Sequence, residues 1–115
     1  MKDILKKIIE GGNTPAYIFD INTLKKRIEY LKDMMPKDVH LCYAIKANTF
    51  IVKDIENDVD RFEVCSPGEY EICKCKKINK EKILISGVYK TPEVIESMAL
   101  NADSNLCLNK YKFRD

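Results

Sequence analysis

RFEVCSPGEYEICKCKKINKEKILIS, residues 61–86, is the stretch of the sequence that decides the fold. Its two apolar runs, RFEVC at 61–65 and ILIS at 83–86, are typical of short buried strands. Between them, the hydroxyl of Ser66 can cap a helix, and Pro67 can occupy its first position. The order strand, cap, helix, strand predicts two parallel strands joined by a crossover helix.

The same spacing recurs along the chain. Strand candidates begin 22 residues apart, near Val39, at Arg61 and at Ile83. Thr91-Pro92 repeats the helix start after the third candidate, and one further period predicts a strand in residues 105–108. Parallel strands need helices over their faces, which favours either an open doubly wound sheet or a closed eight-stranded barrel. Since such a barrel has about 250 residues, we expect a small open α/β domain or part of a larger barrel.

Three elements are predicted before residue 37. Residues 3–10 carry apolar side chains at helical spacing and are followed by Gly11-Gly12, a usual stop signal. Ala16–Phe19 is a brief strand candidate. Asp20 or Asn22 can cap a second helix that Pro36 ends, and its apolar stripe consists of Leu24, Ile28, Leu31 and Met35.

Length and composition restrict the class of protein. The 115 residues fit one domain, and 20 basic against 18 acidic residues leave a formal net charge of +2. Because the two signs are mixed along the chain, nothing favours nucleic acid or an anionic membrane as partner, and a small molecule or another protein is expected. Five cysteines without a C-x-x-C pair suit reduced thiols. With no signal-peptide core and no apolar run of about 20 residues, we expect a cytoplasmic protein.

Lys46 ends the predicted strand within LCYAIKAN, residues 41–48. Alternation places Tyr43 and Ile45 on one face of this strand and Ala44 and Lys46 on the other. By the same rule Glu63 lies on the polar face of the next strand, so we expect it beside Lys46. Active sites collect at the carboxyl ends of parallel strands in both barrels and open sheets.

A lysine in this position can either take part in imine formation or have no catalytic role. A partly desolvated ε-amine becomes nucleophilic and condenses with an aldehyde such as that of pyridoxal phosphate. A neighbouring carboxylate can then pair with a protonated pyridine nitrogen. From pattern alone, a solvated lysine or one paired with a carboxylate is the more common case.

Four segments of the chain resemble the amino-terminal part of diaminopimelate decarboxylases, in order and at the right separations. They are TPAYIFD at 14–20, CYAIKAN at 42–48, RFEVCSPGE at 61–69 and ILISGV at 83–88. The resemblance covers roughly residues 13–103. It implies the alanine-racemase-like class of pyridoxal-phosphate enzymes, in which a (β/α)8 TIM barrel precedes a β domain. Residues 1–115 would then be the amino-terminal part of the barrel, with the second domain absent.

The resemblance also implies roles for individual residues. Lys46 matches the lysine that forms the Schiff base with pyridoxal 5'-phosphate, and Ala44 falls where the family lines the cofactor ring. Glu63 falls where the family usually has an aspartate beside the site. Ser66 and Glu69 match the family's Ser-x-Gly-Glu motif, although the same two residues also form a capping box. The family's glycine-rich phosphate loop and substrate-contacting residues would come later than residue 115.

Several functions stay open on this sequence. The first is a decarboxylase of a diamino dicarboxylate or a basic amino acid, homodimeric as the family is and inactive as 115 residues alone. Related ornithine, arginine or carboxynorspermidine decarboxylases are alternatives. A non-catalytic pyridoxal-phosphate-binding barrel and a regulatory partner of a full-length decarboxylase are others. Amino-acid racemases of this fold match less well, because they usually show Tyr-Gly where this chain has Thr49-Phe50.

Overall fold

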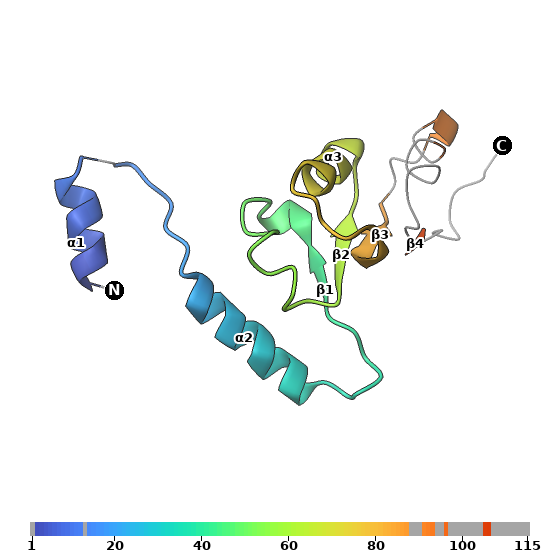
Figure 1. Cartoon of the computed structure of the whole chain (residues 1–115), viewed down its shortest axis with the longest axis horizontal. Coiled ribbons are helices and arrows are strands. Elements are labelled where there is room, and N and C mark those ends of the chain that lie inside the picture. The colour runs from blue at the N-terminus through green and yellow to red at the C-terminus, as the bar shows by residue number, and fades with distance from the viewer. Residues whose placement is uncertain (1, 13, 88–90, 94–95, 97–104, 107–115) are drawn as a thin grey trace.

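The computed structural model describes residues 2–12, 14–87, 91–93, 96 and 105–106 (Figure 1). Its helices are α1 (Lys2–Glu10), α2 (Ile21–Met34) and α3 (Pro67–Cys75). Its strands are β1 (Cys42–Ala44), β2 (Arg61–Val64), β3 (Ile83–Ile85) and β4 (Asn105–Leu106), with single 3-10 turns η1 (Ile45–Ala47) and η2 (Lys80–Lys82).

The four strands form one parallel sheet in the order β1-β2-β3-β4. Strands β2, β3 and β4 begin at residues 61, 83 and 105, so the predicted spacing is confirmed there. The helix α3 connects β2 to β3 as the capping signal predicts, and Pro92 and Glu93 after β3 are helical as well. The fold is therefore mixed α/β with a parallel sheet. The closed barrel stays a prediction.

The helix α2 follows its sequence signals closely. Asp20 is the N-cap, and its carboxylate accepts the Thr23 N–H at 3.0 Å and the Thr23 hydroxyl at 2.9 Å. Ile28 is buried in the core, and Leu24 of the same predicted stripe packs against it. The helix stops at Met34, two residues before Pro36.

Two of the predicted strands differ from the structure. Residues 16–19 have no strand pairing, so the predicted strand there is wrong, and Tyr17 is 95% exposed. A strand needs a hydrogen-bonded neighbour, which the pattern of one segment does not reveal. The strand predicted from Val39 begins only at Cys42 and ends at Ala44, where the chain turns into η1.

A series of turns in residues 49–58 joins β1 to β2 in place of a regular crossover helix. The carbonyl of Ile51 accepts the N–H of Ile55 at 3.3 Å, and that of Ile55 accepts the N–H of Val59 at 3.2 Å. This helix-like bonding puts apolar side chains on one side of the segment. Ile51, Val52, Ile55 and Val59 are all buried.

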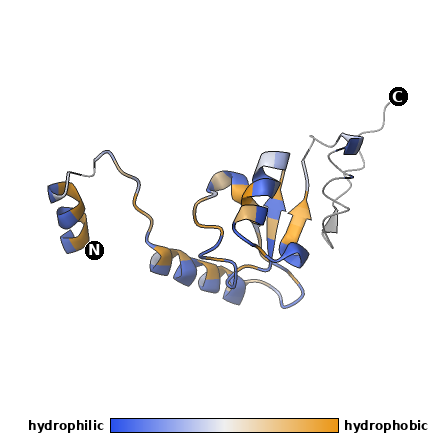
Figure 2. Ribbon diagram, turned by 45° about the horizontal axis from the view of Figure 1, so that its top comes forward, coloured by the Kyte–Doolittle hydropathy of each residue, from blue (hydrophilic) through white to orange (hydrophobic). Residues whose placement is uncertain are grey.

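The core lies on one face of the sheet. Phe62 and Val64 of β2 align with Ile83 and Ile85 of β3, and all four side chains are buried. Tyr43 of β1 meets Phe62 edge to face, with ring centroids 6.3 Å apart. The hydropathy colouring shows apolar residues in the strands and also in stripes along α1 and α2 (Figure 2). α3 adds Tyr70 and Cys73 to this core, and α2 adds Ile28.

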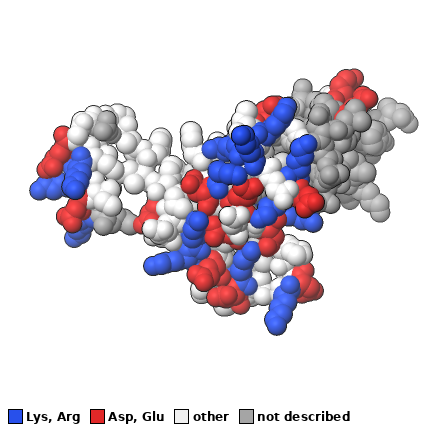
Figure 3. All heavy atoms as spheres, in the orientation of Figure 1, with Lys and Arg blue, Asp and Glu red and all other residues white. Residues whose placement is uncertain are grey.

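A polar contact joins α2 to the start of β1. Asp60 accepts hydrogen bonds from the Lys32 ammonium at 2.8 Å and from the Leu41 N–H at 2.7 Å. Burial raises the pKa of Asp60, but these hydrogen bonds and the Lys32 charge oppose it, and the pKa is lowered overall. Elsewhere the charges of both signs are interspersed over the visible surface (Figure 3).

The helix α1 stands apart from the sheet, and none of its residues is buried (Figures 1 and 2). Its apolar side chains share one face at helical spacing, but Ile4 and Ile9 are exposed. In the described part of the chain, no helix has the length and apolar character needed to cross a membrane.

Candidate functional site

The carboxyl ends of β1, β2 and β3 meet at one edge of the sheet, and the face opposite the core carries the predicted site residues. Ala44, Glu63 and Leu84 lie side by side across the three strands. Cys65 and Ser86 follow on the same face, one pleat closer to the carboxyl edge. The alternation rule thus assigned Ala44 and Glu63 to the correct face.

Lys46 lies in η1, directly after β1, and its side chain is exposed. The strand ends at Ala44, two residues before Lys46, because η1 turns the chain, which buries Ile45 and leaves Lys46 in water. The expectation of a lysine at the end of a buried strand is therefore corrected in this structure. Among the described residues, the ammonium group has no ion-pair partner within 4 Å.

Ala44 and Glu63 are direct neighbours in the register of β1 and β2. Lys46 is two residues farther along, and its ammonium makes no hydrogen bond to Glu63 in the described structure. Glu63 instead accepts the Ser86 hydroxyl at 2.5 Å. The small side chain of Ala44 adds little bulk to the face beside this carboxylate.

Ser86 and Cys65 are two site residues that the sequence reasoning did not select. The Ser86 hydroxyl touches both Glu63 and the Cys65 sulfur, which lies 3.5 Å from it. Ser86 is 8% exposed, and its N–H donates to the Val64 carbonyl at 2.8 Å. The sequence signal for Ser86 was strand alternation. Ser86 follows Leu84 by two residues and so lies on the same face, and Leu84 is the register partner of Glu63.

Gly87 follows Ser86 and is required by the backbone. Its φ is +90°, and a Cβ at this position would lie 2.9 Å from the Cys65 carbonyl oxygen. A larger residue would therefore push the ends of β2 and β3 apart. The absence of a Cβ therefore allows the close approach, and the Ser86 N–H bond to the Val64 carbonyl ties the end of β3 to β2.

Ser66 and Glu69 form the predicted capping arrangement at the start of α3. The Ser66 hydroxyl accepts the Glu69 N–H at 3.3 Å, and the Glu69 carboxylate accepts the Cys65 N–H at 2.8 Å. The capping interpretation is therefore confirmed, with Glu69 reaching one residue farther back than in the usual capping box. A role of these residues toward a cofactor stays a prediction.

The four described cysteines are free thiols. Desolvation raises the pKa of the Cys42 thiol on this face, and the Glu63 carboxylate raises it further. In the part of the chain that the structure describes, no three metal-ligating side chains gather, so the donor set offers no metal site.

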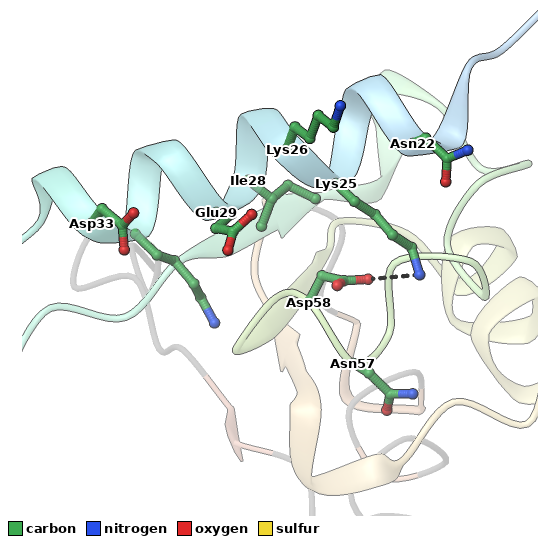
Figure 4. Close-up of a pocket in the computed structure, with 9 residues that line it drawn as sticks. Asn22, Lys25, Lys26, Ile28, Glu29, Asp33, Asn57 and Asp58 are labelled. Carbon is green, nitrogen blue, oxygen red and sulfur yellow. Dashed lines mark ion pairs between the residues drawn. The ribbon is translucent and has the colours of Figure 1, made fainter.

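A separate hollow of about 760 Å³ lies between α2 and the turn at residues 57–58, away from the strand ends (Figure 4). Lys25 and Asp58 face each other across it, with the ammonium nitrogen 3.2 Å from Oδ2. This contact is an ion pair without hydrogen-bond geometry, because the same buried oxygen has no hydrogen-bond partner. The charged, open lining does not resemble the mostly apolar sites that enclose small ligands.

Comparison with known proteins relates this chain to a group of enzymes. Diaminopimelate decarboxylase of Aquifex aeolicus is 34% identical over 89 residues, which cover 76% of this chain and 21% of that protein. Diaminopimelate decarboxylase of Campylobacter jejuni is 31% identical over 91 residues, which cover 76% of this chain and 23% of that protein. The chain thus spans about a fifth of the length of these relatives. No family model and no solved structure matches it.

Proposed function

From its relationship to diaminopimelate decarboxylases, we propose that this chain is the lysine-bearing part of a pyridoxal-phosphate-dependent amino-acid decarboxylase. The single observation that carries the proposal is the place of Lys46. Its amine is exposed after the carboxyl end of β1, on an edge of a parallel sheet where such enzymes act. The barrel and the homodimer belong to the same proposal.

The described residues fit the aldehyde end of this cofactor. The Lys46 amine is accessible and has no ion-pair partner among the described residues, and its unprotonated form can condense with a carbonyl carbon, with loss of water. The small side chain of Ala44 leaves room on the sheet face opposite the core, and the Glu63 carboxylate provides a negative charge next to Ala44. Ser66 and Glu69 fix the start of α3 next to this edge.

The candidate site residues would have different roles in the proposed enzyme. Lys46 would hold the cofactor covalently through its amine, Ala44 would line the space beside the cofactor, and Glu63, Ser66 and Glu69 would shape the surroundings. The bound cofactor would supply an electron sink that stabilises the negative charge left when carbon dioxide departs. Since Lys46 is exposed in this structure, other parts of the enzyme would have to exclude water from it.

The test is covalent labelling of Lys46. The 115-residue chain is incubated with pyridoxal phosphate, reduced with borohydride and mapped by mass spectrometry. We expect the label on Lys46 above the other exposed lysines, and its loss from that position in Lys46→Arg. Lys37→Arg, which changes an exposed lysine before β1, is the matched control and should label like the parent. Equal labelling of all exposed lysines would contradict the proposal.

A second candidate function is cofactor binding without turnover. The exposure of Lys46 favours it for the chain taken alone, because an amine in water lacks the dry surroundings that strengthen electrostatic catalysis. Release of carbon dioxide from diaminopimelate, lysine, ornithine or arginine separates the two. Labelling of Lys46 without release supports a carrier, and brisk release supports an enzyme complete in 115 residues.

A further inference from the structure

Ser86 occupies a fixed position at the end of β3. Its side chain is almost fully buried, and its N–H is bound to the Val64 carbonyl of β2. Gly87, with its positive φ and no Cβ, allows the two strands to lie close together just beyond it. The Ser86 hydroxyl therefore has little freedom to move relative to β2.

The hydrogen bonds around Ser86 have a definite direction. An ionised carboxylate only accepts, so the single hydroxyl proton of Ser86 goes to Glu63 Oε1, 2.5 Å away. The Ser86 oxygen is then left to accept the thiol proton of Cys65, whose sulfur is 3.5 Å away. Cys65, Ser86 and Glu63 thus form one chain of hydrogen bonds that ends on the carboxylate.

Glu63 keeps one oxygen free for a ligand. Its Oε2 has no hydrogen-bond or ion-pair partner among the described residues, and the residue is only half-buried. A carboxylate held in place by one oxygen accepts strong hydrogen bonds from a cationic N–H with the other. The length of glutamate makes the hydroxyl important, because a free side chain of three rotatable bonds would have to be ordered on binding.

We propose that Ser86 is a positioning residue that fixes Glu63, and that Glu63 then binds the ammonium group of an amino-acid substrate through Oε2. The nature of this ligand rests on the proposed function. The positioning itself depends only on the contacts of Ser86.

The test uses the thiol of Cys65 as a reporter of the charge beside it. The full chain is treated with a cationic reagent, 2-(trimethylammonium)ethyl methanethiosulfonate, and separately with neutral methyl methanethiosulfonate. Site-resolved mass spectrometry gives the ratio of the two rates at Cys65. Cys75, exposed on α3, is the internal control, and its ratio should be the same in every variant.

Glu63→Gln should lower the ratio at Cys65 about fivefold, the effect of about 1 kcal/mol between unit charges 4 Å apart in water. Ser86→Ala should lower the ratio toward the Glu63→Gln value, and Ser86→Thr should restore it. Glu63→Asp keeps the charge, but the aspartate side chain is too short to make the same contact with Ser86. The ratio at Cys65 in this variant should therefore also be lower than in the parent. This variant decides the matter if Ser86→Ala fails to fold, as judged by circular dichroism.

Three results would overturn the inference. A parent ratio retained in both Ser86→Ala and Glu63→Asp would show that Ser86 does not position the carboxylate. An unchanged ratio in Glu63→Gln would show that Glu63 attracts no cation. Failure of either reagent to reach Cys65 in the folded chain would show that ligands do not reach this place. Failure of the proposed function is seen separately, as borohydride labelling of Lys46 no greater than that of the other exposed lysines, with the ratios as expected.

Discussion

Cys73 lies on the buried face of α3, and its burial sets its chemistry. Desolvation, with smaller contributions from the Glu69 and Glu56 carboxylates, raises the pKa of the Cys73 thiol to about 11. Cys75 is two residues farther along the same helix and is exposed. The two thiols differ in surroundings within one element, which makes them a natural pair for comparison.

At pH 8 we expect iodoacetamide to modify Cys75 and to leave Cys73 unmodified in the folded chain. A thiol with a pKa of about 11 is ionised to about one part in a thousand at that pH, and only the thiolate reacts. Timed alkylation with mass spectrometry measures both sites. In urea the two rates should become equal, whereas rapid alkylation of Cys73 without denaturant would contradict its buried position.

The raised pKa also has a consequence for stability. The unfolded chain ionises its thiol at a lower pH than the folded one, so the contribution of a neutral Cys73 is complete below the ordinary thiol pKa. It is lost progressively as the pH rises from the ordinary value of 9.0 through the folded value of about 11.

Asp60 is a residue whose charge state should control a contact between elements. Asp60→Asn is expected to lower the free energy of unfolding by about 1 kcal/mol at neutral pH, because it removes a charged acceptor from Lys32 and from the Leu41 N–H. The lowered pKa of Asp60 means that its stabilisation is present above the ordinary value of 3.8 and is lost as the pH falls below it.

Urea titrations of the parent and Asp60→Asn at several pH values measure this. The difference between them should shrink as the pH falls below 3.8. Asp54→Asn, at an exposed position in the same crossover, is the control and should match the parent throughout. A difference that does not change with pH would exclude the carboxylate as its source.

At the scale of elements, the caps decide where helices begin. Ser66→Ala removes the acceptor for the Glu69 N–H and should destabilise the chain by about 1 kcal/mol. Ser66→Asp keeps an acceptor and should restore most of this. Thermal unfolding followed by circular dichroism measures both variants, and equal melting temperatures for the parent and Ser66→Ala would show that the cap contributes nothing.

The elements also show how far the sequence could predict this structure. The sequence correctly predicted the helix caps at Asp20 and Ser66, because a cap depends on residues close together in the chain. It also predicted the spacing of β2, β3 and β4, because their starts follow a simple period. The end of β1 at Ala44 was not predicted, since a single 3-10 turn is decided by the burial of Ile45 in the assembled core. The strand predicted at residues 16–19 was wrong because no neighbouring strand pairs with that segment, which a local pattern does not reveal.

For the candidate site, the sequence could predict which face of the sheet carries the residues but not the contacts that they make. Alternation put Ala44 and Glu63 on the correct side of the sheet, and the position of Lys46 near the carboxyl end of a predicted strand indicated it as a candidate. The contact between Glu63 and Ser86 depends on the register of β2 against β3, which no local pattern contains. The exposure of Lys46 likewise depends on the whole arrangement.

For the whole molecule, the interior centres on Phe62. This residue is 0% exposed in β2, between the two neighbouring strands. Phe62→Ala should cost about 3–5 kcal/mol, a large part of the roughly 5–15 kcal/mol that stabilises an ordinary domain. We expect this variant to be largely unfolded or to unfold at much lower urea concentration.

Phe50→Ala is the matched control, because Phe50 is 77% exposed and its loss should change stability by less than about 0.5 kcal/mol. Both variants are compared by urea unfolding monitored by circular dichroism. Similar midpoints for the two would mean that the sheet does not depend on the packing between Tyr43 and Phe62.

The separation of α1 from the sheet has a practical consequence for the laboratory. A helix without a buried side chain tolerates a bulky attachment, since nothing beneath it needs to be repacked. A dye, a biotin or a fusion protein joined near Lys2 would therefore leave the strand ends unobstructed. Immobilised in this way, the chain would present Lys46 to ligands in flow for surface-based binding assays.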